Sequence, residues 1–158
     1  MNTLVRFLQF FALGTWIGAI LFFSAIMTRA AFTVLTQQQA GNLVNLTLGQ
    51  LHLAGMVCGV VYLIVTVAGA RTPAALLRPA PLLVFAMIVL TFISQFWVIP
   101  NMEALRAQAN GPLEALAAGD PLRASFDRLH ALSVRLEVGV LIAGIIALLL
   151  NSRPPPAP

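Results

Sequence analysis

The sequence predicts an all-α protein, an integral membrane four-helix bundle, and three observations support this prediction. Of the 158 residues, 59% are hydrophobic and only 9% are charged, whereas about a quarter of the residues in a soluble domain are charged. Four apolar stretches each come close to the roughly 20 residues that a helix needs to cross a bilayer. The apolar residues do not alternate with a period of two over long stretches, which argues against a transmembrane barrel.

The four predicted spans form a single domain that covers residues 1–153. They lie at about residues 7–28, 46–70, 80–100 and 128–150. The first apolar run has roughly 21 residues, longer than the hydrophobic region of a typical signal peptide, so we interpret it as a retained helix. Residues 154–158 follow as a proline-rich tail that is unable to continue a helix.

Two start signals predict that the helices extend beyond their apolar parts. Thr36 and Gln39 have the spacing of a capping box, which begins the second helix there and lets the first continue to about Val34. Asp120 and Pro121 are an acidic N-cap followed by proline at the first helical position, so the fourth helix begins about ten residues before its apolar run. Asn110-Gly111-Pro112 predicts a break between the third and fourth helices.

Arginine alone supplies the positive charge, and its distribution predicts the orientation. The chain ends and the short loop between the second and third spans carry arginine without any acid: Arg6, Arg71, Arg78 and Arg153. The opposite side has as many arginines, mixed with acids. Two arginines in one short loop favour cytoplasmic termini. We therefore expect a multi-pass protein of a bacterial inner (plasma) membrane.

Several function classes find no support in the sequence. The arginines are not clustered with interleaved aromatic residues, so we expect no nucleic-acid binding. A single cysteine, Cys58, excludes an internal disulfide and a thiolate metal cluster. The common hydrolase, metalloprotease and phosphate-loop motifs are absent, so we expect no enzymatic activity.

Polar side chains of the fourth predicted helix are the main functional candidates. They are Asp127, Arg128, His130, Ser133, Arg135 and Glu137. Ionisable groups at membrane depth usually face a bundle interior, a partner or water. Arg135 and Glu137 lie inside the apolar run, where each could pair with another helix, and Arg135 could instead snorkel outward.

A histidine of the second helix is expected at the same depth as one of the fourth. His52 lies 19 residues before Arg71, and His130 lies 21 residues before Asn151. Because the two helices run in the same direction, at 1.5 Å per residue their depths agree within roughly 3 Å. Gln95 and Ser24 fall at a similar depth, so the sequence predicts a polar layer in one leaflet.

Three interpretations of His52 and His130 stay open at this point. The two imidazoles could ligate the iron of haem b, with Arg128 or Arg135 meeting the propionates. Gly49 and Gly55 would leave room for the macrocycle beside His52.

In the second interpretation the two histidines bind a soft metal ion, with Met27 and Met56 as further donors. In the third, each histidine only forms hydrogen bonds with a neighbour near the membrane interface.

Small-residue motifs at Gly14 and Gly18 and at Gly55 and Gly59 are interpreted as helix-packing surfaces.

Three segments resemble the transmembrane protein 205-like family of small membrane proteins. The segments are Gly14-Thr15-Trp16-Ile17-Gly18, Trp97-Val98-Ile99-Pro100 followed by Arg106, and Phe126-Asp127-Arg128-Leu129-His130-Ala131-Leu132-Ser133. The resemblance implies a four-helix membrane fold. Because the eukaryotic member is associated with resistance to a platinum drug, it also suggests the handling of soft metals, or export.

Three functions therefore remain as hypotheses. The first is a ligand-binding bundle that holds haem b or a soft metal ion near the outer leaflet. The second is a non-catalytic accessory subunit of a larger membrane complex, and the third is a small metal or drug exporter. The expected partners are the lipid bilayer and either other membrane subunits or further copies of the chain.

Overall fold

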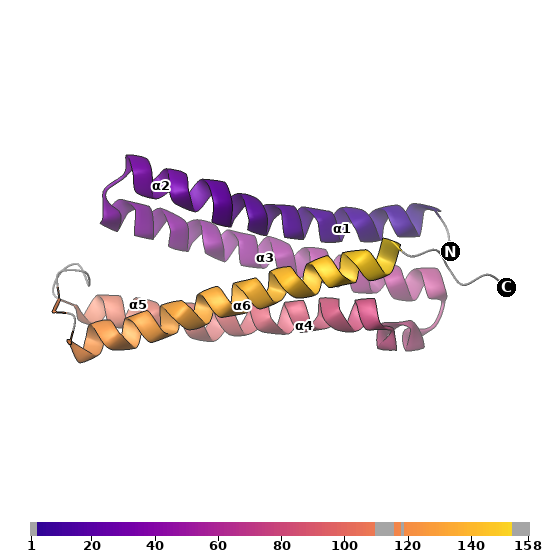
Figure 1. Cartoon of the computed structure of the whole chain (residues 1–158). Coiled ribbons are helices and arrows are strands. Elements are labelled where there is room, and N and C mark those ends of the chain that lie inside the picture. Colours follow the sequence, from indigo (N-terminus) through magenta and orange to yellow (C-terminus); the bar gives the residue numbers. More distant parts are fainter. Residues whose placement is uncertain (1–2, 110–115, 118, 153–158) are drawn as a thin grey trace.

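The computed structural model describes residues 3–109, 116–117 and 119–152, and these form an antiparallel bundle of four long helices (Figure 1). The long helices are Thr3–Val34, Gln37–Ala70, Pro79–Gln108 and Pro121–Ser152. We call the end of the bundle with Thr3 and Ser152 the terminal end, and the opposite end the distal end. The all-α four-helix fold predicted from the sequence is confirmed.

A π-helical turn interrupts each of the first and third long helices, and a 3₁₀ turn joins the second long helix to the third. In chain order the elements are α1 (Thr3–Phe22), the π-helical turn η1 (Phe23–Met27), α2 (Thr28–Val34), α3 (Gln37–Ala70), the 3₁₀ turn η2 (Pro73–Leu77), α4 (Pro79–Ile93), the π-helical turn η3 (Ser94–Val98), α5 (Ile99–Gln108) and α6 (Pro121–Ser152). Each predicted span lies inside one long helix. The predicted break at 110–112 and the tail at 154–158 lie outside the described residues.

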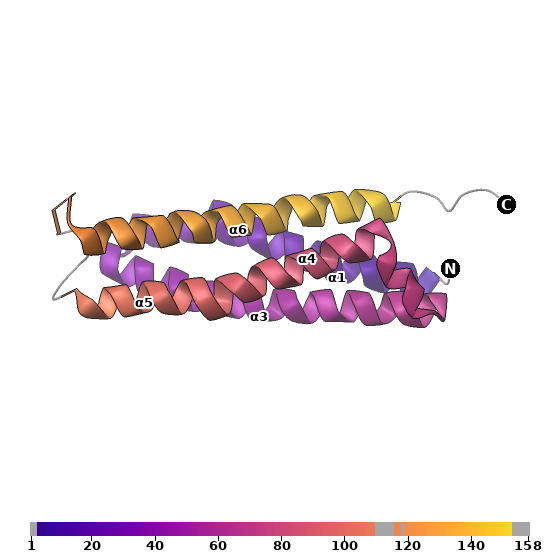
Figure 2. The same cartoon turned by 90° about the horizontal axis from the view of Figure 1, so that it is seen from below.

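Each long helix packs against two neighbours and faces the fourth helix across a diagonal. α1 packs against α3 and α6, and α4 packs against the same two helices. α3 and α6 therefore lie diagonally opposite each other, as do α1 and α4 (Figure 2). A side chain that joins α3 to α6 must consequently cross the centre of the bundle.

The helices are longer than the hydrocarbon layer that they have to cross. They contain 30 to 34 residues, which at 1.5 Å per residue gives about 45–51 Å, against about 30 Å of hydrocarbon. Charged residues of the described chain, such as Arg29, Glu103, Arg106 and Arg128, gather towards the distal end. The chain is thus a small multi-pass membrane protein, and the distal parts of its helices project beyond the apolar layer.

Both predicted helix starts are confirmed. The Gln39 backbone N–H donates to Thr36 Oγ1 and the Thr36 backbone N–H donates to Gln39 Oε1, which completes the capping box of α3. The Leu122 backbone N–H donates to the Asp120 carboxylate at 2.7 Å, so α6 begins at Pro121. These local bonds replace the helical partners that the first N–H groups of any helix lack.

The two small-residue motifs have different surroundings. A Cβ atom built at Gly55 would overlap Trp16 Nε1, and one at Gly59 would lie 2.8 Å from the same indole ring. Trp16 is 1% exposed, so it occupies the space that these glycines leave. A Cβ at Gly14 or Gly18 would meet nothing within 4 Å. Gly55 and Gly59 therefore form a helix-packing surface within this chain, as predicted. Gly14 and Gly18 are exposed and pack against no other helix of the described chain.

A π-helical turn lies at the same level in each of two diagonal helices. In η3 the Ile99 backbone N–H donates to the carbonyl of Ser94, five residues back. Pro100 follows at once, and its missing N–H and crowding ring prevent a regular α-helical bond at that point. In η1 the Thr28 backbone N–H donates to the carbonyl of Phe23. Isolated π turns of this kind often occur at functional sites.

Replacing Gly55 should reveal how much the bundle depends on the close approach of Trp16. We expect Gly55→Ala to lower the free energy of unfolding by about 1–3 kcal/mol, because the new methyl overlaps a rigid indole ring. Gly14→Ala is the matched control, and helix propensity should leave its stability unchanged or raise it by up to about 1 kcal/mol. Reversible unfolding in mixed micelles measures both, and equal losses would contradict the assigned packing.

Candidate functional site

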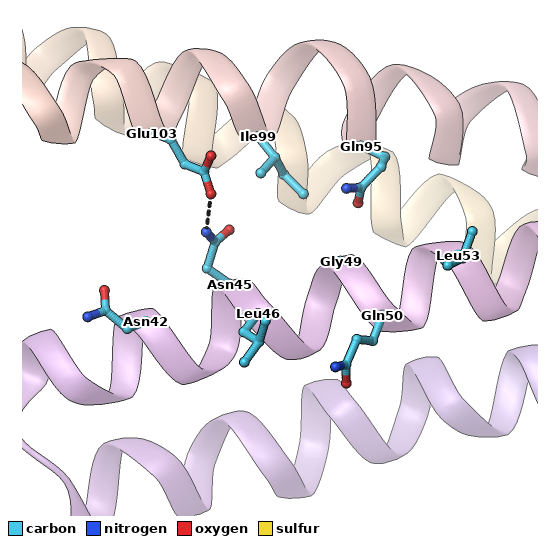
Figure 3. A pocket seen from close by; sticks show the side chains of 9 residues that line it. All are labelled: Asn42, Asn45, Leu46, Gly49, Gln50, Leu53, Gln95, Ile99 and Glu103. Carbon is cyan, nitrogen blue, oxygen red and sulfur yellow. Dashed lines mark hydrogen bonds between the residues drawn. The ribbon is translucent and has the colours of Figure 1, made fainter.

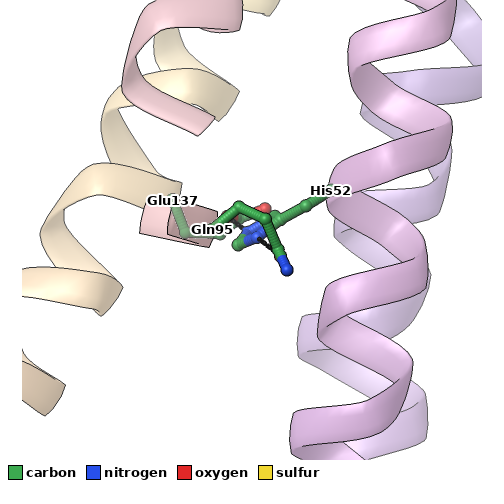
Figure 4. A network of polar contacts seen from close by, with 3 residues as sticks. All are labelled: His52, Gln95 and Glu137. Atoms are coloured by element: carbon green, nitrogen blue, oxygen red, sulfur yellow. Dashed lines mark hydrogen bonds and ion pairs between the residues drawn. The ribbon is translucent and has the colours of Figure 1, made fainter. Parts of the chain in front are cut away.

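His52 is enclosed at the centre of the bundle and joins three long helices. Its side chain projects from α3 and is fully buried. Its Nδ1 lies 2.9 Å from Gln95 Oε1 in η3, and its Nε2 lies 3.1 Å from Glu137 Oε2 in α6 (Figure 4). The contact with Glu137 crosses the α3–α6 diagonal. We call His52, Gln95 and Glu137 the central triad.

The hydrogen-bonding groups of the triad determine where its protons lie. An amide oxygen only accepts hydrogen bonds, so Nδ1 of His52 carries a hydrogen and donates it to Gln95 Oε1. One further proton is then shared between His52 Nε2 and Glu137 Oε2. The pair is either an imidazolium with a carboxylate or a neutral imidazole with a carboxylic acid, and both states complete the same hydrogen bond.

Buried polar atoms without a partner gather at the level of the triad. Among the described residues they include Glu137 Oε1, Ser94 Oγ, Thr91 Oγ1 and Trp16 Nε1. Glu137 is a member of the triad, and Ser94 directly precedes Gln95 in the sequence. Thr91 lies one helical turn before Gln95, in α4. The Trp16 nitrogen lies against Gly55, one turn from His52. Buried polar groups normally have partners, so this concentration marks the layer as a candidate site.

A groove lined by polar and apolar side chains leads from the distal end to the triad. It has a volume of about 560 Å³. It lies between α3 and the η3–α5 segment, and its lining residues are Asn42, Asn45, Leu46, Gly49, Gln50, Leu53, Gln95, Ile99 and Glu103 (Figure 3).

Glu103 gives the groove a negative charge. The Asn45 amide donates to Glu103 Oε1 at 2.6 Å, which leaves the negative charge of this carboxylate without a cation beside it in the groove. Gln95 lines the groove and accepts the hydrogen bond from His52. The groove and the triad therefore share this one side chain, and no positively charged residue is among those that line the groove.

The structure brings together three of the predicted site residues. His52, Gln95 and Glu137 are in direct contact, and Ser133 is buried one turn from Glu137 in α6. The other four candidates are exposed: Asp127, Arg128, His130 and Arg135. The His130 ring stacks on Phe126 with 6.3 Å between the centroids. His130 and Arg135 therefore do not face the bundle interior, and for Arg135 this agrees with the alternative of an outward-pointing side chain.

His52 and His130 are not at one depth, because the helices that carry them do not end level with each other. The Tyr62 hydroxyl donates to Asn151 Oδ1 at 3.0 Å, so the end of α6 lies beside Tyr62, well before Arg71. α3 projects beyond α6 at the terminal end (Figure 1). This offset brings Glu137 to His52, and His130 lies seven residues away, about 10 Å along α6.

Haem b does not fit between these histidines. The space beside Gly55 that was expected to admit a macrocycle holds the Trp16 indole, and a Cβ at Gly49 would lie 3.7 Å from the Gln95 amide. Nε2 of His52 faces Glu137 rather than His130. Met27, one of the expected sulfur donors, packs against the apolar core.

Sequence reasoning missed the groove, although its pattern is present in the chain. Asn42, Asn45 and Gly49 lie three and four residues apart, which places them on one face of α3. Ile99 and Glu103 are likewise four residues apart on α5. The polar face of α3 before His52, together with Glu103 two turns after Gln95, was the available signal for a groove between these helices.

The chain was compared with protein families, curated proteins and solved structures. Residues 11–111, more than half of the chain, match the family described as a domain of unknown function, DUF4149. The chain belongs to the DUF4149 family. The match includes His52, Gln95 and all residues that line the groove, whereas Glu137 lies beyond it. No curated protein and no solved structure matches this DUF4149 protein.

The buried His52 should contribute far more to stability than the exposed His130. We expect His52→Ala to lower the free energy of unfolding by about 3–5 kcal/mol, because it leaves the Glu137 carboxylate and the Gln95 amide without their partner. His130→Ala should change it by no more than about 0.5 kcal/mol. Unfolding in mixed micelles compares the two variants, and similar losses would contradict the central position of His52.

Proposed function

We propose that this DUF4149 protein is a ligand-binding membrane bundle whose central triad binds a divalent metal cation. In this proposal His52 Nε2 and the Glu137 carboxylate are the protein ligands, and Gln95 orients the imidazole. The proximity of a buried imidazole nitrogen and a partly buried carboxylate, 3.1 Å apart, is the observation that carries the proposal.

The hydrogen bond from His52 to Gln95 supports this assignment. A histidine that ligates a metal commonly donates its other ring N–H to an acceptor, which fixes the tautomer and the ring orientation. Here Nδ1 donates its hydrogen to Gln95 Oε1. Nε2, which faces Glu137, therefore offers its lone pair to a metal once the proton that it shares with Glu137 has left. Intramembrane ionisable residues in contact with one another typically mark substrate or ion sites.

The unpartnered atoms and the groove provide a second line of support. Glu137 Oε1 is buried without a partner among the described residues, and a bound cation would satisfy it. The groove leads to Gln95, and its charged lining residue is Glu103, so its electrostatic field favours a cation over an anion.

Imidazole and carboxylate donors favour borderline and hard ions such as zinc, manganese or cobalt over soft ions. The proposal therefore replaces the soft-metal expectation with a cation of this class. Among the described residues no three His, Cys, Asp or Glu side chains gather to hold a metal. Two protein ligands leave the remaining coordination positions to water or to the substrate of the site.

Binding of a divalent cation at the triad is expected to release one proton. A divalent cation held by His52 and Glu137 would displace the proton that the two side chains share. One proton is thus released for each ion bound, because both ligands must be deprotonated. Proton release is a readout that distinguishes the triad from a surface carboxylate, which is already ionised at neutral pH.

We further propose the setting expected from the sequence: a bacterial inner membrane with cytoplasmic termini, and kinship with the transmembrane protein 205-like family. Arg71 and Arg78 in one short loop support the orientation. The distal end then faces outward, and the groove opens towards the outer leaflet. The lipid bilayer, other membrane subunits or further copies of the chain are the partners in this setting.

A second function, metal or drug export, is favoured by a separate observation. At the terminal end the Gln9 amide donates to Thr66 Oγ1 at 2.8 Å, and Tyr62 donates to Asn151, so buried polar groups occur in both halves of the bundle. A permeating cation needs such groups on both sides of the centre. The accessory-subunit hypothesis stays a prediction from the sequence.

Metal binding to the purified protein tests the proposed function. We expect one zinc or manganese ion per chain, with one proton released, in a calorimetric and pH titration in weakly buffered detergent. Glu137→Gln and His52→Gln should weaken binding at least about 100-fold, since loss of an outer partner alone costs about 10–100-fold. Gln95→Leu should fall within that smaller range.

The exposed residues of the same types provide matched controls. Asp127→Asn and His130→Gln should bind the ion as the unaltered protein does. Binding without proton release, or equal losses in the control variants, would contradict the site. A Soret band in the absorption spectrum would instead show that the protein holds haem.

A further inference from the structure

A second pocket lies between α5 and α6 at the distal end, on the other side of α5 from the groove. Its volume is about 370 Å³. The lining residues are Asn101, Ala104, Leu105 and Gln108 of α5 and Ser125, Arg128 and Leu129 of α6. The proposed cation site uses none of these residues.

The geometry points to a binding site for the phosphate group of an anionic lipid in this pocket. The terminal nitrogens of Arg128 would hold the phosphate oxygens, the Gln108 amide would add a donor, and Leu105 and Leu129 would contact the apolar part of the lipid. This inference is independent of the proposed cation site.

The depth of the pocket fits a lipid headgroup. Arg128 lies three residues before Ala131, where the apolar run of α6 begins, and Asn101 lies two residues after Ile99, where the apolar run of the third helix ends. At 1.5 Å per residue both are within about 5 Å of the apolar boundary. The headgroup region extends about 5–8 Å beyond the hydrocarbon on each side.

The donors in the pocket suit a phosphate. Arg128 uses its Nε to donate to the Ala124 carbonyl at 3.3 Å, and its two terminal nitrogens have no hydrogen bond among the described residues. A guanidinium group held in this way presents paired N–H groups to two phosphate oxygens. The Gln108 amide also has no partner among the described residues, and no carboxylate lines the pocket.

The surrounding charge favours an anion as well. Arg106 lies over the Phe126 ring with 5.0 Å from its Cζ to the centroid, and Arg123 donates to the Leu116 carbonyl. Arg128 is the arginine that lines the pocket, and Arg106 and Arg123 add positive charge to the distal parts of α5 and α6. Asp127, adjacent to Arg128 in sequence, is exposed and is not among the lining residues.

Native mass spectrometry of the full chain in detergent, titrated with phosphatidylglycerol or with phosphatidylcholine, tests this inference. We expect one phosphatidylglycerol per chain to bind saturably and more tightly than phosphatidylcholine. Arg128→Gln should weaken phosphatidylglycerol binding about tenfold or more, the cost of losing charge-assisted hydrogen bonds. Arg128→Lys should recover only part of the loss, because a lysine offers no paired donors.

Arg29→Gln is the matched control, since Arg29 is an exposed arginine at the distal end of another helix. Its binding of phosphatidylglycerol should equal that of the unaltered chain. An equal loss in Arg29→Gln, or equal affinity for the two lipids, would overturn the site in favour of general surface attraction. Displacement of the lipid by millimolar inorganic phosphate would overturn the lipid as the source of the phosphate. Circular dichroism confirms that each variant remains folded.

Discussion

The arrangement of the bundle depends on two successive turns of α3, because contacts from this segment fix the other three long helices. His52 forms hydrogen bonds with Gln95 in the third long helix and with Glu137 in the fourth. One turn later Gly55 lets Trp16 of the first helix approach closely. Hydrocarbon offers polar groups no alternative partners. The hydrogen bonds of His52 therefore have to be made inside the bundle, and they hold the diagonal pair of helices together.

The irregular turns of the first and third long helices belong to the same layer. Pro100 ends the regular bonding of α4, and the resulting π turn begins at Ser94, beside Gln95. The extra residue in such a turn alters the direction in which neighbouring side chains point. Gln95 can thereby line the groove and still accept the hydrogen bond from His52. The proline that disturbs the helix thus contributes to the connection between the groove and the triad.

The sequence predicted the fold well because length, apolarity and capping residues act locally. The capping box at Thr36 and the start of α6 at Pro121 depend on residues within one turn. The sequence also predicted that His52 and Gln95 share a polar layer, but it placed His130 there, whereas Glu137 is the residue that meets His52. The pairing of His52 with Glu137 was not predictable, because it depends on how far α6 slides along α3, and the bond between Tyr62 and Asn151 sets that offset. The direction of exposed side chains such as His130 depends on the same tertiary register.

The polar contacts of the triad could serve packing alone or a ligand, and the unpartnered oxygen of Glu137 is the observation that favours a ligand. A buried acceptor without a hydrogen bond costs about 1–3 kcal/mol, and more if it is charged. A structural bridge would gain from a fully satisfied carboxylate, yet Glu137 uses one oxygen for His52 and leaves the other buried without a described partner. Such a cost is consistent with a group that is satisfied when a ligand arrives. A ligand that binds only the folded bundle also stabilises it, so the triad can couple cation binding to the packing of three helices.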